Sequence, residues 1–236
     1  MKSIRLYFLF LIGCLEAASY TPSSLPTLGA GAEYHKKDYS YLLGKLSGIS
    51  DPLLEMHFTL YSGYVKNTNS LAAALRDMRM KGEDQTIAYG ALKRRFAWEY
   101  DGMYLHELYF GNLGGKASLS PKSSLYQKIV LDYGSYKDWE KNFKATGLIR
   151  GVGWVILYQD PLDGFLYNIW VDEHHINHMA GGAPLLVMDV WEHAYITQFG
   201  LDRGKYIDAF FENIDWGVIE KRFADQNPMN QGMLRE

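Results

Sequence analysis

The sequence predicts an α+β protein, in which an antiparallel helical hairpin domain precedes a domain built from a three-stranded antiparallel sheet and helices. Three observations support this prediction. Apolar residues recur at helical spacing over residues 51–110, a Gly- and Ser-rich segment follows at 113–122, and three short runs rich in β-branched and aromatic residues lie beyond it. Long helices followed by strands and further helices are typical of the α+β class.

The composition is that of a globular protein without a nucleic-acid partner. The 236 residues are 47% hydrophobic, and this length is sufficient for one good core or for two small ones. The net charge is −3 and the sequence has no basic blocks, so it lacks the positive surface that nucleic-acid binding requires. We therefore exclude nucleic acid as a partner.

Residues 1–19 are expected to be a signal sequence. A short basic start is followed by about nine apolar residues, too few to span a bilayer as a helix but typical of an export signal. Residues 11–14 fit a lipoprotein signal with a lipid anchor through Cys14, whereas residues 17–19 offer an ordinary signal-peptidase site. Both alternatives stay open, and both predict export to the periplasm or cell envelope. Because Cys14 is the only cysteine, the mature chain has no internal disulfide.

The helical hairpin domain is predicted at residues 50–112, after a tether and a loop at 20–49. Its first helix is expected over 51–82, with Asp51 as the N-cap and Pro52 as the first helical residue. The apolar face of this helix is formed by residues that recur every three or four positions, namely Leu53, Met56, Leu60 and Tyr64.

A second helix is predicted over 86–110, and the linker 113–122 then leads to an α+β domain at 123–225. The turn sequence at 161–164 joins the first two strands of this domain. Helices are expected at 124–132, 135–146, 191–198 and 203–214, strands at 152–160, 165–173 and 183–189, and a tail at 226–236.

Three histidines and one aspartate stand in apolar surroundings: His57, His106, His193 and Asp189. A single histidine on an apolar face is more often a core residue than a ligand, but three of them with a carboxylate favour a metal site. Imidazole and carboxylate ligands suit iron, manganese or zinc, and the lack of cysteine ligands argues against structural zinc. Such a set carries one negative charge, so it can hold both a divalent and a trivalent ion. The spacing alone does not bring the four residues together.

Residues 189–195, Asp-Val-Trp-Glu-His-Ala-Tyr, resemble the signature of the iron and manganese superoxide dismutases. The resemblance covers roughly residues 40–225 and includes further matches in the same order at Tyr64-Val65, Gly153-Trp154, 184–186, 203–206 and 213–216. In that family a helical hairpin supplies two histidines and an α+β domain supplies an aspartate and a histidine. The fold predicted from periodicity agrees with this arrangement.

The resemblance implies one iron or manganese ion per subunit, held by four ligands: His57, His106, Asp189 and His193. It implies superoxide as the substrate and dioxygen and hydrogen peroxide as the products. Tyr64 resembles the tyrosine that gates the substrate funnel, and Trp154 and Trp191 resemble the residues that wall the metal pocket. Glu192 resembles the residue that bonds a ligand histidine of the partner subunit. A homodimer or a dimer of dimers is therefore expected.

The chain departs from the family in its first helix. His57 and Tyr64 are seven residues apart where the family commonly has eight, and Tyr61 stands where a histidine is expected. Because residues 57, 61 and 64 share a helical face, we assign Tyr64 as the gate and Tyr61 as its neighbour. An aromatic position that is usually tryptophan is Phe110 here.

The family often uses a glutamine to hydrogen-bond the metal-bound solvent, and this chain lacks it. Met103 occupies the first place where that glutamine occurs, and His174 occupies the second, with His175 as the alternative. His174 and His178 lack the glutamate of a zinc-protease pair, so that interpretation is disfavoured. The missing glutamine favours iron, although manganese or the use of both metals stays open.

Two alternatives to a dismutase are considered. One is an iron oxygenase type of enzyme on the same fold, but its sites use fewer protein ligands. The other is an envelope lipoprotein that keeps the fold as a metal-binding or interaction module, and the four intact ligand positions argue against it. Lys66 and Arg203 are candidates for attracting the anionic substrate.

Overall fold

The computed structural model describes residues 33–226, of which residues 34–226 belong to one compact unit. The predicted signal sequence with Cys14 and nearly all of the tail lie outside the described residues. Among the helices within residues 33–226, none has both the length and the apolar character that crossing a bilayer demands.

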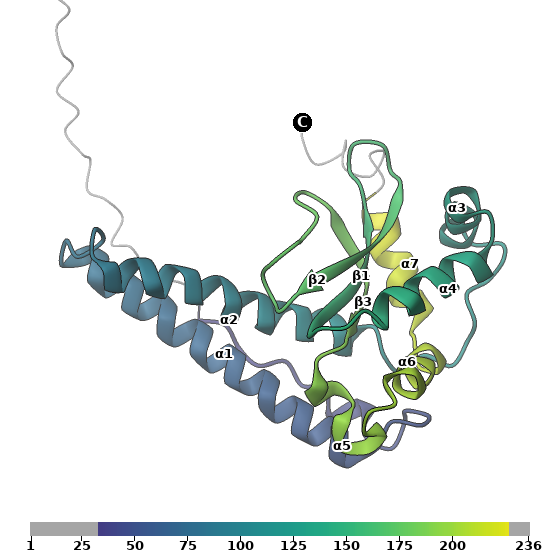
Figure 1. Ribbon diagram of the computed structural model, residues 1–236, viewed down its shortest axis with the longest axis horizontal. Coiled ribbons are helices and arrows are strands. Elements are labelled where there is room, and N and C mark those ends of the chain that lie inside the picture. Colours follow the sequence, from purple (N-terminus) through teal and green to yellow (C-terminus); the bar gives the residue numbers. More distant parts are fainter. Residues whose placement is uncertain (1–32, 227–236) are drawn as a thin grey trace, which may run out of the picture. The chain divides into compact units, whose positions relative to one another are not determined.

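Two long helices form the predicted hairpin: α1 (Asp51–Met80) and α2 (Ile87–Gly111) run in opposite directions side by side (Figure 1). The N-cap of α1 is Ser50 rather than the expected Asp51, whose carboxylate instead accepts a hydrogen bond from Gly44 N at 2.7 Å. The side chain of Thr86 caps α2 by accepting from Tyr89 N. A short 3-10 helix, η1 (Ser40–Leu42), lies in the loop before α1.

The C-terminal half contains the predicted three-stranded antiparallel sheet, in the order β2-β1-β3. The helices α3 (Ser124–Tyr133) and α4 (Tyr136–Gly147) precede it, and its strands are β1 (Gly153–Gln159), β2 (Leu166–Asp172) and β3 (Ala183–Asp189). Trp154 on the central strand pairs with Val171 on one side and with Asp189 on the other. This register places the Trp154 side chain next to the end of β3. The predicted α+β fold is therefore confirmed.

The last part of the chain differs from the prediction in two places. The helix expected over 191–198 is a 3-10 turn, η2 (Glu192–Ala194), followed by the single turn α5 (Ile196–Phe199). α6 (Arg203–Glu212) was expected, but α7 (Trp216–Asp225) was not. The Asp215 carboxylate starts α7 by accepting hydrogen bonds from Gly217 N and Val218 N.

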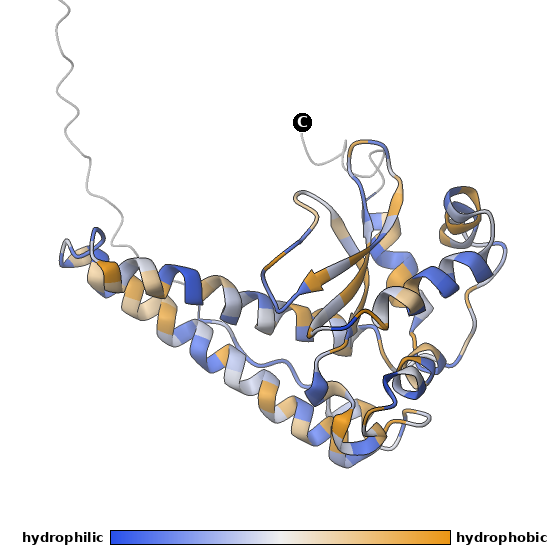
Figure 2. Cartoon of the chain, in the orientation of Figure 1, coloured by the Kyte–Doolittle hydropathy of each residue, from blue (hydrophilic) through white to orange (hydrophobic). Residues whose placement is uncertain are grey.

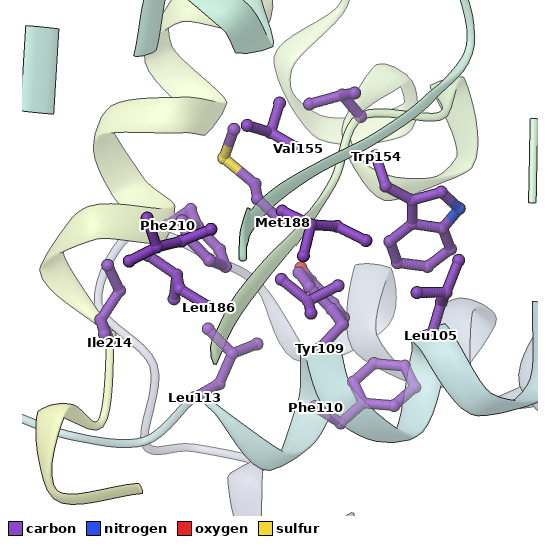
Figure 3. Close-up of a cluster of buried hydrophobic side chains, with 14 of the residues drawn as sticks. Leu105, Tyr109, Phe110, Leu113, Trp154, Val155, Leu186, Met188, Phe210 and Ile214 are labelled. Atoms are coloured by element: carbon purple, nitrogen blue, oxygen red, sulfur yellow. The ribbon is translucent and has the colours of Figure 1, made fainter. Parts of the chain in front are cut away.

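One cluster of buried side chains joins the hairpin to the sheet. Figure 3 shows side chains of α2, β1, β3 and α6 in the same space, and Trp154, Met188 and Phe210 are completely buried there. In Figure 2 both long helices carry hydrophilic and hydrophobic residues along their length. Residues on both sides of the predicted linker 113–122 contribute to this cluster, and the division of the chain there stays a prediction.

Candidate metal centre

The structure brings four predicted residues together from four elements. His57 comes from α1, His106 from α2, Asp189 from the end of β3 and His193 from η2, and one potential ligand atom of each lies within 4.8 Å of the others. His57, His106 and Asp189 are buried, whereas the side chain of His193 keeps 20% of its surface exposed. Residues that are 136 positions apart in the sequence therefore form one compact group of nitrogen and oxygen donors.

The donor atoms converge on one carboxylate oxygen. Oδ2 of Asp189 lies 3.1 Å from His57 Nε2, 3.0 Å from His193 Nε2 and 3.6 Å from His106 Nε2. His106 Nδ1 donates to the carbonyl of Gly102, so the Nε2 atom of a neutral His106 carries no proton. This buried nitrogen has no hydrogen-bond partner among the described residues. A cation among these donors would satisfy it, so the residues present fit a metal ion.

The protonation states also suit a metal. Burial lowers the pKa of His57 and of His106, which keeps both imidazoles neutral. Burial by itself favours the neutral acid of Asp189, but the adjacent imidazole of His193 and hydrogen bonds from His193 and His57 hold the pKa of Asp189 below its ordinary value. His57 and His106 therefore offer neutral imidazoles and Asp189 offers a carboxylate, the forms in which these groups bind metals.

The orientation of Asp189 is fixed by its surroundings. Its Oδ1 atom accepts a hydrogen bond from Trp191 N at 2.8 Å, and its main-chain carbonyl accepts one from the Tyr206 hydroxyl at 2.7 Å. Oδ2 is thereby left to face the three histidines. The bond to Trp191 N also turns the chain directly after β3. The helix expected over 191–198 is divided at Tyr195, whose φ of −145° lies outside the helical region.

His174 and Tyr64 form a hydrogen-bonded pair beside this cluster. His174 is completely buried, and its Nδ1 accepts a hydrogen bond from Trp154 Nε1 at 3.1 Å. Because an indole N–H can only donate, the proton of neutral His174 is on Nε2, which donates to the Tyr64 oxygen at 2.7 Å. Burial lowers the pKa of His174 to about 3 and raises the pKa of Tyr64 to about 12, so both groups are neutral.

The shorter spacing in α1 still brings Tyr64 to the site. The ring of Tyr64 stacks on His106, with centroids 5.1 Å apart, in a helix that has no interruption between His57 and Tyr64. Tyr61 has a different environment, because its hydroxyl donates to the carboxylate of Glu107 at 3.0 Å. The structure thus places Tyr64, and not Tyr61, against His174.

Aromatic rings enclose the cluster. Trp154 meets His106 edge to face at 5.0 Å, Trp191 stacks on His174 at 4.6 Å, and Phe110 lies 4.9 Å from His57. Trp98, which was not among the predicted site residues, also lies here, with its ring 5.7 Å from that of His174. Its position eight residues before His106, on nearly the same face of α2, is the signal that could have identified it.

The remaining candidates lie elsewhere. His175 stacks on Trp98, and its buried Nδ1 has no hydrogen-bond partner among the described residues. Glu192 is exposed, and the structure gives its side chain no hydrogen bond or ion pair within residues 33–226. Arg203 is engaged in structure, since it donates to the carbonyls of Ile149 at 2.8 Å and Gly151 at 2.9 Å. Lys66 is exposed on α1.

Gly102 is a second site residue that was not among those predicted. It precedes Met103, and a Cβ atom added to it would lie 2.6 Å from Cδ1 of the Tyr64 ring. We expect Gly102→Ala to displace Tyr64 and to lower turnover about tenfold, because small misplacements of a site residue are costly. Bound metal should be unchanged. Metal analysis and, since the family resemblance implies it, the rate of superoxide decay check this. Gly90→Ala on the same helix, where an added Cβ meets nothing within 4 Å, is the control. Equal activities of the two variants would contradict the expectation.

A helical hairpin, an antiparallel sheet and a largely buried His₃Asp donor cluster together define a mononuclear metalloprotein class. The protein-family model described as "Iron/manganese superoxide dismutases, C-terminal domain" matches residues 121–222 of this chain. "Superoxide dismutase [Fe]" of Cupriavidus metallidurans is 37% identical over 194 residues, which cover 81% of this chain and 96% of that protein. The chain belongs to the iron/manganese superoxide dismutase family.

Relatives with either metal in their names are similar to this chain. "Superoxide dismutase [Fe]" of Aquifex aeolicus is 38% identical over 183 residues, which cover 75% of this chain and 85% of that protein. "Superoxide dismutase [Mn] 2" of Haloferax volcanii is 36% identical over 176 residues, which cover 74% of this chain and 87% of that protein. The names thus include both iron and manganese.

Proposed function

We propose that this protein is a superoxide dismutase, which converts two superoxide anions and two protons into dioxygen and hydrogen peroxide. The observation that carries the proposal is the convergence of His57, His106, Asp189 and His193 in a member of this family. These four side chains would hold one iron or manganese ion. When bound, the ion would supply the one-electron redox chemistry that alternately oxidises and reduces superoxide.

The other residues of the site control protons and access. Because His174 Nε2–H donates to the Tyr64 oxygen, the hydroxyl proton of Tyr64 is free to be donated to a different acceptor. The raised pKa of Tyr64 keeps the phenol neutral, so it does not repel an anionic substrate. By donating to His174 Nδ1, Trp154 leaves the proton of neutral His174 on Nε2, from which it is donated to the Tyr64 oxygen.

Product stoichiometry tests the proposal. Superoxide is added in large excess over the metal-loaded protein, and dioxygen and hydrogen peroxide are both measured. A dismutase forms one molecule of each from two superoxide anions over many turnovers. Hydrogen peroxide without dioxygen would identify a reductase, and no reaction by a metal-loaded protein would favour a binding module. The metal-free protein serves as the control.

Iron is the metal that we propose. The support for iron is a sequence observation, namely that the family's glutamine is absent and that His174 stands at its second place. Metal analysis of the protein purified from its own source tests this choice. Manganese in place of iron, with full activity, would overturn it.

A dimer that completes the metal site is also proposed. The exposed Glu192 carboxylate has no partner within residues 33–226, and the structure gives no hydrogen bond to His193 Nδ1 in the same range. An isologous pair of subunits would join Glu192 of one copy to His193 of the other and orient the ligand ring.

We expect Glu192→Ala to dissociate the dimer and to lower activity about tenfold, because it removes the acceptor that orients His193. Sedimentation analysis and activity at equal metal content measure the two effects. Glu83→Ala, which removes another exposed carboxylate, is the control. A Glu192→Ala protein that remains dimeric and fully active would be inconsistent with the proposed interface.

Export to the periplasm or cell envelope is proposed from residues 1–19, with lipidation at Cys14 as one of two processing alternatives. Fractionation of cells that produce the full chain or its Cys14→Ser variant tests both points. Membrane attachment that is lost in the variant supports the lipid anchor. A released protein in both cases supports ordinary cleavage, and retention of both in the cytosol overturns export.

A further inference from the structure

The loop that carries His174 has an unusual backbone conformation. It follows β2 and is closed by two main-chain hydrogen bonds between Asp172 and Ile176, of 3.0 and 3.3 Å. Glu173 and Asn177 have positive φ angles of 51° and 67°, which residues other than glycine adopt rarely. Such a conformation persists only when surrounding contacts hold it.

His178 provides one of these contacts. Its ring lies between the loop and the central strand, with Nε2 2.8 Å from the main-chain oxygen of His174 and Nδ1 2.7 Å from the Tyr158 hydroxyl. A carbonyl oxygen can only accept, so His178 Nε2 carries the proton and its Nδ1, when neutral, accepts from Tyr158. The carboxylate of Asp101 on α2 lies 4.0 Å from Nε2. Both ring nitrogens are thus engaged, which leaves His178 no role as a metal ligand in this arrangement.

His174 is consequently held at three atoms. Its carbonyl oxygen is bound by His178, its Nδ1 by Trp154 and its Nε2–H by Tyr64. The two contacts of the ring determine its tautomer, but they can be made together only if the backbone lies at the right place. Among the described residues, His178 is the side chain that fastens the His174 carbonyl.

We propose that His178 is a positioning residue, which sets the place of the His174 imidazole, and through it the Tyr64 hydroxyl, by its hydrogen bond to the His174 carbonyl. This inference rests on the proposed superoxide dismutase function. His178 itself touches none of the four candidate ligands through a hydrogen bond or an ion pair. Its effect on turnover is therefore expected to leave metal content unchanged.

Two variants distinguish the hydrogen bond to the His174 carbonyl from the mere presence of a polar side chain at position 178. His178→Gln keeps an N–H donor at the place of Nε2, whereas His178→Asn keeps a polar group only at the place of Nδ1. We expect the asparagine variant to lose about tenfold in kcat at unchanged metal content, and the glutamine variant to recover most of it. Equal activity of the asparagine variant and the unaltered protein would overturn the proposal, as would a glutamine variant as impaired as the asparagine variant.

Nitrogen-15 NMR of the metal-free protein provides a readout that does not depend on activity. The unaltered protein should show His174 as one neutral tautomer, with the proton on Nε2. His178→Asn should show a mixture of both tautomers, and a single unchanged tautomer would contradict the proposed role. If the metal-loaded unaltered protein fails to dismutate superoxide, the proposed function falls, while the tautomer of His174 still decides the positioning role.

Tyr158→Phe keeps the test decisive if the His178→Asn protein does not fold. It removes the hydroxyl that hydrogen-bonds His178 Nδ1 but leaves the imidazole in place. We expect a smaller change in the same direction, in both kcat and the His174 spectrum. A Tyr158→Phe protein that matches the unaltered protein in both measurements would count against the proposal.

Discussion

Replacing Asp189 by asparagine is expected to remove the metal and, with it, superoxide turnover. Asparagine has the same shape, but it lacks the negative charge on which three Nε2 atoms converge. Removing one partner of a buried charge pair costs about 3–5 kcal/mol, which corresponds to a roughly 10²- to 10⁴-fold loss of metal affinity. Neutral imidazoles alone cannot compensate the charge of a buried cation.

Metal content after dialysis and the rate of superoxide decay measure this effect. Asp77→Asn on α1 is a suitable control, because Asp77 is exposed and pairs with Lys81 on the surface, where ion pairs contribute little. The control should retain metal and activity. An Asp189→Asn protein that keeps a full complement of metal through dialysis would show that the carboxylate is not a ligand.

The second large effect is expected for His174→Ala, which should lower turnover about 10- to 100-fold while the metal remains bound. The substitution removes the donor to the Tyr64 oxygen and the acceptor of the Trp154 indole. It also leaves the buried Trp154 N–H without a partner, which should lower the free energy of unfolding by about 1–3 kcal/mol. Activity, metal content and denaturant unfolding together measure these consequences.

The neighbouring residue offers a matched control for this prediction. His175→Ala removes an imidazole whose Nδ1 has no hydrogen-bond partner among the described residues, so both turnover and stability should change much less. If both alanine variants lose activity to the same extent, the distinction between the two histidines is wrong. Loss of metal from His174→Ala alone would instead make His174 a ligand.

Strong local patterns made much of the fold and site predictable. The apolar periodicity of α1 and α2 and the β-branched runs of the sheet gave these elements within a few residues of their observed bounds. Histidine in apolar surroundings directed attention to His57 and His106. The convergence of these residues with Asp189 depends on tertiary packing, which periodicity does not encode.

Other features of the fold and the site have weak signals in the sequence or none. The helical pattern after Asp189 was misleading, because the backbone at Tyr195 leaves the helical region and divides the expected helix into η2 and α5. α7 is short, and the Asp215 cap that begins it was overlooked. The Tyr64 ring packs so closely against Gly102 that a Cβ atom there would overlap it. The sequence does not show this contact, because it depends on how α1 and α2 pack.

The most direct test of the central claim, that His57, His106, Asp189 and His193 form one redox metal centre for superoxide, is the rate of superoxide decay. It should be measured with protein loaded separately with iron and with manganese, alongside His106→Ala treated in the same way. We predict catalytic decay in proportion to bound metal, with iron as the better cofactor, and neither bound metal nor catalysis in the variant. Metal-dependent decay that is equally fast in His106→Ala would contradict the account.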